Sequence, residues 1–367
     1  MRTFVRVAVA VEDVVQRVIV VVLRLLGRHR PLVNPFVAHG TTHRARVGAR
    51  VVLGRSAAAP PAEPTPGARS RWKVLRASAA RFLTLELPDV PVIVRTPNGS
   101  STVMADREGY VDAEVELPGL EPGWHELGLA LEGGDGSVVP AKLLVVDPAA
   151  RVGLISDVDD TILETGLTRG LAVVKATLFT DVADRAPLPG AAALYRELLR
   201  DGDGVERPVF YVSTSPWNLH EMLMQFLVLR GFPLGPLLLT DWGPSHSGLF
   251  RLGAQDHKLR LVRRVLADHP GLQLVLVGDS GQLDPEIYAT LAREAPDRIR
   301  AVYIRRTKGR TAARDAEVDA LAAEVTAAGV PMVAVDDSVQ IAEHAAGLGL
   351  LDGGAVEAVR QACRELP

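Results

Sequence analysis

From Val152 onward, short apolar runs alternate with stretches of helical periodicity, and this alternation constrains the fold more than any other feature. The apolar runs are 152–155, 209–212, 274–277, 299–304 and 330–335. The helical stretches include 191–199, 219–229, 258–266, 285–294, 315–328 and 341–348. A parallel strand that is buried on both faces is apolar throughout. We therefore predict an α/β domain over residues 149–367, with a Rossmann-like parallel sheet covered by helices on both faces.

The region before Asp147 has a different pattern of short, often alternating apolar runs. These runs are 47–53, 82–87, 90–95, 111–117, 124–131 and 138–146. Turn formers such as Pro97-Asn98-Gly99 separate them, which is typical of a small antiparallel β-sandwich. We predict such a domain over residues 31–148. Residues 56–70, rich in alanine and proline, are expected to form an extended loop inside it.

Residues 1–30 are strongly apolar, but charged side chains interrupt them at Arg6, Glu12, Asp13, Arg17 and Arg24. A membrane span needs about 20 nearly uncharged residues, and no stretch here reaches that length. A secretory signal is also poorly supported, because no small-residue cleavage site follows a compact apolar core. We predict an amphipathic helix that docks on protein, and a peripheral membrane anchor remains the alternative.

The overall charge and the cysteine content exclude several classes of function. The 367 residues carry a formal net charge of −3, which gives no general attraction to polyanions, so nucleic acid is not expected as a partner. The single cysteine cannot form an internal disulfide or a cysteine-based zinc cluster. These features fit a cytoplasmic protein, with a peripheral place on the inner face of the membrane as the alternative.

Polar residues follow three of the apolar runs at the point where each predicted strand ends. They are Asp157, Asp159 and Asp160 after the first run, Ser213-Thr214-Ser215 after the second, and Asp279 and Asp284 after the third. Ligands bind at the carboxyl ends of such strands. Crowded carboxylates repel one another unless a cation neutralises them, and Mg²⁺ is the economical choice. The alternative is that the acids only cap helix N-termini.

Four segments of the chain resemble, in order, the four motifs of haloacid-dehalogenase-superfamily phosphotransferases. Asp157-x-Asp159-x-Thr161 resembles the first motif, Ser213 the second, Lys258 the third, and Gly278-Asp279 with Asp284 the fourth. More narrowly, the strings 156–162, 211–217, 257–258 and 278–286 are similar to the catalytic domain of the actin-patch-protein type of phosphatidate phosphatase. The resemblance covers about residues 151–350.

This resemblance implies a catalytic role for two aspartates. Asp157 would attack phosphorus and form an aspartyl-phosphate, which splits a difficult hydrolysis into two easier displacements. Asp159 would protonate the leaving alkoxide and later take a proton from the hydrolytic water. Haloacid dehalogenases proper lack a carboxylate at this second position, so its presence favours phosphoryl chemistry.

The resemblance also implies a metal site and a phosphate site. Mg²⁺ would be held by Asp157, the Asp159 backbone carbonyl and Asp279, with Asp284 either a direct ligand or a residue that supports the ligands. The phosphoryl oxygens would be held by Ser213, Thr214 and Lys258. From the residues alone, Ser213 has a competing interpretation as the cap of a helix near Trp217, and Asp284 as the N-cap of a helix that starts at Pro285.

The spacing of the motifs bears on the substrate. Asp157 and Ser213 are 56 positions apart, and Ser213 and Lys258 are 45 positions apart. Neither interval leaves room for a large cap domain, so we expect a minimal cap and a fairly open site. Such a site suits a large or interface-bound phosphomonoester, and we predict a phosphatidate phosphatase that releases diacylglycerol and phosphate. Alternatives are a phosphatase of soluble monoesters and a non-catalytic binding or scaffold protein.

Overall fold

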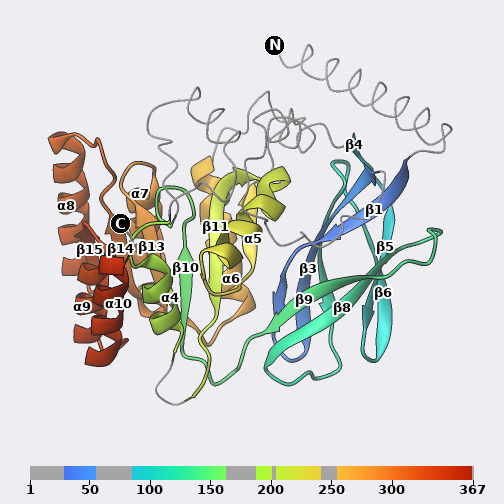
Figure 1. Cartoon of the computed structure of the whole chain (residues 1–367), viewed down its shortest axis with the longest axis horizontal. Coiled ribbons are helices and arrows are strands. Elements are labelled where there is room, and N and C mark those ends of the chain that lie inside the picture. Colours follow the sequence, from blue (N-terminus) through green and yellow to red (C-terminus); the bar gives the residue numbers. More distant parts are fainter. Residues whose placement is uncertain (1–28, 55–84, 163–186, 201–203, 241–253, 366–367) are drawn as a thin grey trace, which may run out of the picture. The chain divides into compact units, whose positions relative to one another are not determined.

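A computed structural model describes residues 29–54, 85–162, 187–200, 204–240 and 254–365 (Figure 1). The predicted N-terminal helix and the alanine- and proline-rich loop lie outside these ranges, apart from the last two residues of the helix segment. Contacts divide the chain into two units. The first takes the described residues up to Val146 together with Pro216–Asn218 and Ala254, and the second takes the remainder. No helix in the described ranges has the length and apolar character needed to cross a membrane.

The first unit is a nine-stranded sheet within the described residues. Its strands are β1 (Arg30–Pro35), β2 (Ala38–Gly40), β3 (Arg44–Gly54), β4 (Leu85–Glu86), β5 (Pro91–Thr96), β6 (Gly99–Met104), β7 (Tyr110–Glu116), β8 (Gly123–Leu131) and β9 (Val139–Val145). Their order is β1-β3-β2-β9-β8-β5-β6, and β4 and β7 also pair with β3. All of these pairs are antiparallel except β2–β9.

Alternating apolar residues of these strands form the core of the first unit. Val47, Ala49 and Val51 of β3 are fully buried, and they join Val92 and Leu129 in one apolar cluster. A half-buried strand alternates in this way because successive side chains point to opposite faces. The predicted sandwich is therefore confirmed only as a mainly antiparallel β unit. Its strands join in a single sheet, and one of its pairings is parallel.

The second unit contains a six-stranded sheet. Its strands are β10 (Val152–Ser156), β11 (Val209–Pro216), β12 (Leu237–Thr240), β13 (Gln273–Asp279), β14 (Ile299–Arg305) and β15 (Met332–Val335), in the order β12-β11-β10-β13-β14-β15. The pairs β10–β11, β10–β13, β13–β14 and β14–β15 are parallel. The predicted α/β class and parallel sheet are thus confirmed.

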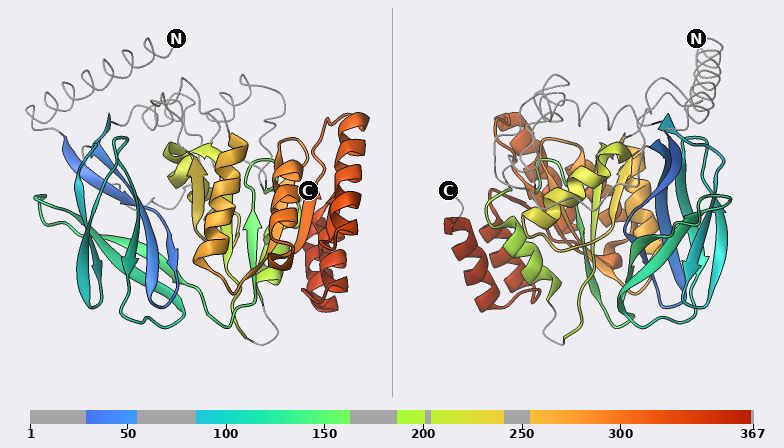
Figure 2. Two further views of the ribbon diagram at one scale, coloured as in Figure 1. Left: turned by 180° about the vertical axis from the view of Figure 1, so that it is seen from behind. Right: turned by 45° about the vertical axis from the view of Figure 1, so that its right-hand side comes forward.

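Helices cover both faces of this sheet (Figures 1 and 2). They are α4 (Ala191–Leu199), α5 (His220–Leu229), α6 (Ala254–Asp268), α7 (Asp284–Glu294), α8 (Ala312–Ala327), α9 (Ser338–Gly347) and α10 (Gly353–Glu365), with short 3₁₀ turns at Trp217–Leu219 and Pro296–Arg298. Helices α4, α9 and α10 pack against one another, and α7 packs against α8. Figure 2 shows α7 and α8 in front when the view is turned to the back, while α4 is in front in Figure 1.

The strand order places a switch point beside β10. The chain runs outward from β10 to β11 and β12, and it then returns to add β13 on the other side of β10. In open α/β sheets, the crevice at such a point, outside the carboxyl ends of the strands, is where ligands bind. The fold therefore brings the residues after β10 and β13 to the expected position for a site.

Candidate active site

The candidate site lies at the carboxyl ends of β10, β11 and β13. Asp157 directly follows β10, and its backbone N–H donates to Val277 O of β13 at 2.9 Å. Asp279 is the last residue of β13, and Ser213 lies in β11. The three polar strand ends that the sequence analysis singled out are therefore adjacent in the sheet.

Asp157 lies at the centre of the group and is 1% exposed. Its Oδ1 accepts a hydrogen bond from Lys258 Nζ at 2.7 Å, and its Oδ2 accepts one from Thr161 Oγ1 at 2.9 Å. Burial raises the pKa of Asp157 to about 8, against the lowering effect of the Lys258 ammonium. Both carboxylate oxygens are thus oriented by neighbours, which is how a side chain that attacks a substrate must be held.

Lys258 brings the positive charge to this group from α6. Its Nζ donates to Asp157 and also, through a very short contact, to Oδ1 of Asp284. The side chain is 1% exposed, and its ammonium lies 5.8 Å from the centre of the Tyr288 ring. Burial acts to lower the pKa of Lys258, but the carboxylates of Asp157 and Asp284 outweigh it and hold the pKa well above its usual value. Lys258 is therefore a permanent cation in the site.

Asp159 is held by two hydroxyls from β11. Its Oδ2 accepts hydrogen bonds from Ser213 Oγ and Ser215 Oγ, both at 2.9 Å. Ser215 N–H in turn donates to Ser213 Oγ at 2.9 Å. Burial raises the pKa of Asp159, and the two serine hydroxyls oppose that rise. A raised pKa is the direction of shift that a general acid needs.

Asp279 and Asp284 complete an acidic group with Asp157. One carboxylate oxygen from each of the three lies within 4.8 Å of the others, and all three residues are buried. Asp279 Oδ1 accepts from Gly281 N–H at 2.6 Å and from Gln282 N–H at 2.9 Å. Within the described part of the chain, its Oδ2 is buried without a hydrogen-bond partner. Burial, and next the Asp284 carboxylate, raise the pKa of Asp279 well above its usual value.

These carboxylates fit a bound Mg²⁺. Magnesium prefers oxygen ligands and commonly takes one or two carboxylates together with substrate phosphate. Lys258 supplies one positive charge beside three carboxyl groups, so ionisation of all three would leave an excess of negative charge that a cation would balance. The unpartnered Asp279 Oδ2 is a buried acceptor of the kind that a cation would use.

The two alternative capping interpretations do not agree with the structure. Ser213 lies within β11, which extends to Pro216, the residue before the 3₁₀ turn at Trp217–Leu219, and α5 begins at His220 without a side-chain cap. Asp284 is the first residue of α7, and its carboxylate accepts from Asp279 N–H at 3.2 Å and from Lys258. Thr214 is half-buried between the two serines. The regions in which a cap insertion would fall, 163–186 and 241–253, lie outside the described residues.

Some residues around this buried group lie nearer the surface. Ser215, which contacts Asp159, is half-buried, and Gly281, which contacts Asp279, is exposed. Leu283, between Gln282 and Asp284, is 47% exposed. Asp157 itself is thus buried, whereas Ser215 and Gly281, which contact Asp159 and Asp279, are half-buried and exposed.

Sequence reasoning gave no role to several residues that hold the site. The sequence could have pointed to Ser215, because it lies two residues after Ser213, and residues two positions apart in a strand lie on the same face. Thr161 belongs to the first motif, but its bond to Asp157 depends on the turn at Asp160, where φ is 54°. Nothing in the sequence pattern singled out Arg314, which contacts the loop after β13.

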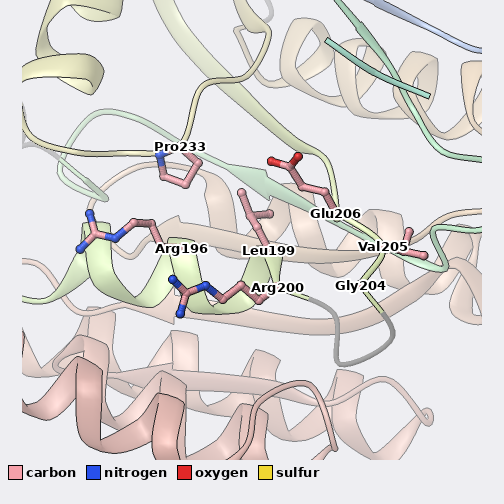
Figure 3. Close-up of a pocket in the computed structure, with 7 residues that line it drawn as sticks. All are labelled: Arg196, Leu199, Arg200, Gly204, Val205, Glu206 and Pro233. Atoms are coloured by element: carbon pink, nitrogen blue, oxygen red, sulfur yellow. The ribbon is translucent and has the colours of Figure 1, made fainter. Parts of the chain in front are cut away.

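A separate cavity of about 340 Å³ lies away from these groups. Figure 3 shows its lining residues, which are Arg196, Leu199, Arg200, Gly204, Val205, Glu206 and Pro233. They come from the end of α4 and from the segments that precede β11 and β12, at the amino ends of the strands. Arg196 donates to Gly231 O at 2.6 Å, and Arg200 donates to Glu197 at 2.9 Å. The cavity therefore lies at the opposite edge of the sheet from the carboxylates.

The fold and the site together define an α/β protein with a buried group of carboxylates and one lysine at a strand switch point. The part of the chain that carries this site is similar to known proteins. Residues 152–306 match the family described as "Phosphatidate phosphatase APP1, catalytic domain". This segment contains every candidate site residue named from the sequence, and the similarity predicted there is confirmed.

Two curated yeast proteins are similar over the same region. Phosphatidate phosphatase APP1 of Saccharomyces cerevisiae is 33% identical over 154 residues, which is 42% of this chain and 26% of that protein. An uncharacterised protein of Schizosaccharomyces pombe is 27% identical over 157 residues, or 42% of this chain and 25% of that protein. The chain thus matches about a quarter of the length of these relatives.

The similarity to solved structures is weak. A carbohydrate acetylesterase from Xanthomonas citri aligns with 92% of this chain and 75% of its own, at 12% identity and a TM-score of 0.28. A score this low does not establish a shared fold.

Proposed function

We propose that the protein is a Mg²⁺-dependent phosphomonoesterase that acts through an aspartyl-phosphate and hydrolyses phosphatidate. The observation that carries this proposal is the contact of Lys258 Nζ with both Asp157 and Asp284, beside Asp279 and Asp159, at the switch point of the sheet. The similarity of residues 152–306 to a phosphatidate phosphatase catalytic domain supports it. The same arrangement of strands and motifs makes a haloacid-dehalogenase type of domain part of the proposal.

Asp157 is the proposed nucleophile. Its carboxylate oxygen attacks phosphorus while the bond from phosphorus to the ester oxygen breaks, which gives an aspartyl-phosphate and an alcohol. Thr161 and Lys258 hold the carboxylate during this step. Water then attacks the same phosphorus, and inorganic phosphate leaves as Asp157 is regenerated.

Asp159 is the proposed acid and base. In its protonated form it donates to the departing alkoxide, and the carboxylate that results takes a proton from the attacking water in the second step. The two serine hydroxyls fix the orientation of this carboxyl group. Protonation matters because the alkoxide of diacylglycerol is a poor leaving group.

The remaining polar groups of the site are the proposed contacts for the metal ion and for the phosphoryl oxygens. Mg²⁺ would be held by Asp157, Asp279, Asp284 and the Asp159 carbonyl, and it would offset the negative charge of the phosphoryl oxygens. Ser213, Thr214 and Lys258 are the proposed donors to those oxygens. Lys258 also balances the charge of the nucleophile.

Phosphatidate is proposed as the substrate because the relative of 33% identity is named for that activity. A lipid substrate would bring the protein to a membrane surface, and peripheral contact there is part of the proposal. The nearly neutral charge gives no reason to add a nucleic acid partner.

Phosphate release tests the proposal. Purified protein should release phosphate from phosphatidate in mixed micelles only with Mg²⁺, and Asp157→Asn should lower turnover by at least about 1,000-fold. Water-soluble monoesters, measured in parallel, decide the substrate class. Higher kcat/KM for soluble esters would replace the lipid assignment, and full activity in Asp157→Asn would remove the mechanism.

A further inference from the structure

Arg314, in the first turn of α8, connects three parts of the second unit. Its Nε donates to Ser280 O at 3.0 Å, and its Nη2 donates to Gln282 O at 2.9 Å. Its Nη1 and Nη2 also donate to the Glu286 carboxylate of α7, at 2.5 and 3.1 Å. One guanidinium therefore ties the loop 280–282, which follows β13, to the starts of α7 and α8.

The loop that Arg314 holds is the loop that orients Asp279. While the carbonyls of Ser280 and Gln282 accept from Arg314, the N–H groups of Gly281 and Gln282 donate to Asp279 Oδ1. Two further bonds fix the first residue of the loop, from Ser280 N–H to Arg305 O at 2.8 Å and from Thr307 N–H to Ser280 Oγ at 3.1 Å. Asp279 Oδ1 is thereby occupied, and Oδ2 is the oxygen left for a ligand among the described residues.

The chemistry of arginine suits this task. A planar guanidinium presents several donors in a fixed arrangement, so it can hold two carbonyls and a carboxylate at once, whereas a lysine ammonium is a flexible point charge. The paired hydrogen bonds to Glu286 fix the plane of the guanidinium. Any tilt of that plane would move both loop carbonyls, and with them the amides that hold Asp279.

We propose that Arg314 is a positioning residue of the metal site, which keeps the loop 280–282 in the form that aims Asp279 Oδ2 at a divalent cation. This inference rests on the Mg²⁺ site of the proposed function and adds a residue outside the 152–306 match. Groups that orient a metal ligand typically change metal affinity by about 10- to 100-fold when they are removed. We expect a loss in that range for Arg314→Gln.

A second ion pair between the same two helices provides a matched control. Arg293 of α7 donates to Glu324 of α8 at 2.8 Å, and both side chains are exposed. Arg293→Gln therefore removes an α7–α8 pair without touching the loop after β13. If Arg314 acted only by joining the helices, the two variants would behave alike.

The experiment measures Mg²⁺ affinity by titration calorimetry and by the Mg²⁺-dependent melting temperature, for the full-length chain and for Arg314→Gln, Arg314→Lys and Arg293→Gln. We expect Arg314→Gln to bind Mg²⁺ about 10- to 100-fold more weakly, Arg314→Lys to recover only part of the loss, and Arg293→Gln to match the unchanged protein. In Arg314→Gln, the KM for the substrate at saturating Mg²⁺ should change by a smaller factor than the Mg²⁺ affinity. Equal Mg²⁺ affinity in Arg314→Gln and the unchanged protein would overturn the inference.

Hydrogen exchange in the absence of Mg²⁺ separates this inference from the metal site itself. Arg314→Gln should speed exchange at the amides of Gly281 and Gln282, while Arg293→Gln should leave it unchanged. Unchanged exchange at both amides would overturn the role of Arg314 whatever the metal result. If the unchanged protein bound no Mg²⁺, the proposed function would lose its metal site and Arg314 its role in it.

Discussion

Lys258 Nζ lies 2.7 Å from Asp157 Oδ1, and both side chains are 1% exposed. The two residues are 101 positions apart in the chain, on α6 and at the end of β10. The Lys258 ammonium lowers the pKa of Asp157 against the larger effect of burial, and so favours the ionised form that a nucleophile needs. The same ammonium contacts Asp284, so it links the proposed nucleophile to the proposed metal ligands.

Loss of this cation should destabilise the second unit. In Lys258→Met, Asp157 and Asp284 would be left as buried carboxylates without their partner, which typically costs about 3–5 kcal/mol. Arg263→Met on the same helix removes an exposed pair with Glu294 and should cost less than about 1 kcal/mol. Urea unfolding in EDTA measures both free energies, and equal values for the two variants would contradict the assigned burial of the pair.

Asp159→Asn should separate the two chemical steps. Asparagine keeps an oxygen for the serine hydroxyls but cannot transfer a proton, so turnover of phosphatidate should fall by about 100- to 10,000-fold. With p-nitrophenyl phosphate, whose leaving group needs no acid, stopped-flow absorbance should show a burst of up to one nitrophenolate per site, followed by slow release.

Asp160→Asn is the control for that variant. Asparagine tolerates the φ of 54° at this position, and turnover should stay within a few-fold of the unchanged protein. A loss in Asp160→Asn as large as in Asp159→Asn would show that the acid had been assigned to the wrong residue.

Gly278→Ala should disturb the position of Asp284. A Cβ at Gly278 would lie 2.7 Å from Tyr288 Cε2 and would also collide with the Asp284 carboxylate. We expect a loss of about 1–3 kcal/mol in the free energy of unfolding, together with weaker Mg²⁺ binding. Gly271→Ala meets open space and should change neither quantity, as thermal melts with and without Mg²⁺ would show. An unchanged Mg²⁺ affinity in Gly278→Ala would argue against Asp284 as a ligand.

His269 should make the stability of the second unit depend on pH. Burial lowers the pKa of His269 to about 4, below the usual value of 6.5 in the unfolded chain. The unfolded chain therefore takes up the proton first, so stability falls as the pH drops below about 6.5 and levels off near 4, by up to about 3 kcal/mol.

His269→Phe removes this titration and retains a ring beside Phe210. The difference in unfolding free energy between the variant and the unchanged protein should shift by about 3 kcal/mol in favour of the variant between pH 7 and pH 4. Parallel curves across that range would show that His269 does not titrate as its burial implies.

The architecture of the second unit was predictable because its strands are buried on both faces. Continuous apolar runs identified five of its strands, whereas β12, with four residues between proline-containing segments, gave too short a signal. Helix α10 begins with Gly353-Gly354, which hid its amphipathic pattern. In the first unit, β6 is almost wholly exposed and mostly polar, so apolar alternation could not reveal it.

The site was predictable wherever a residue lies at or just after the end of a strand. Asp157, Asp159 and Asp279 lie at such places, and parallel strands end at one edge of the sheet. Lys258 required the resemblance, since a single lysine in a helix carries no signal of its own; α6 begins at Ala254, four residues before it. Arg314 was missed because its role depends on the packing of α7 against α8, which no spacing along the chain encodes.

Covalent labelling tests the central claim most directly. The protein would be mixed with Mg²⁺ and ³²P-labelled phosphatidate in micelles, quenched in acid, and digested for mass spectrometry. We predict a label on Asp157 that survives acid, that is removed by hydroxylamine and that is absent in Asp157→Asn. Turnover of phosphatidate without a label on Asp157, or with the label on another residue, would contradict the account.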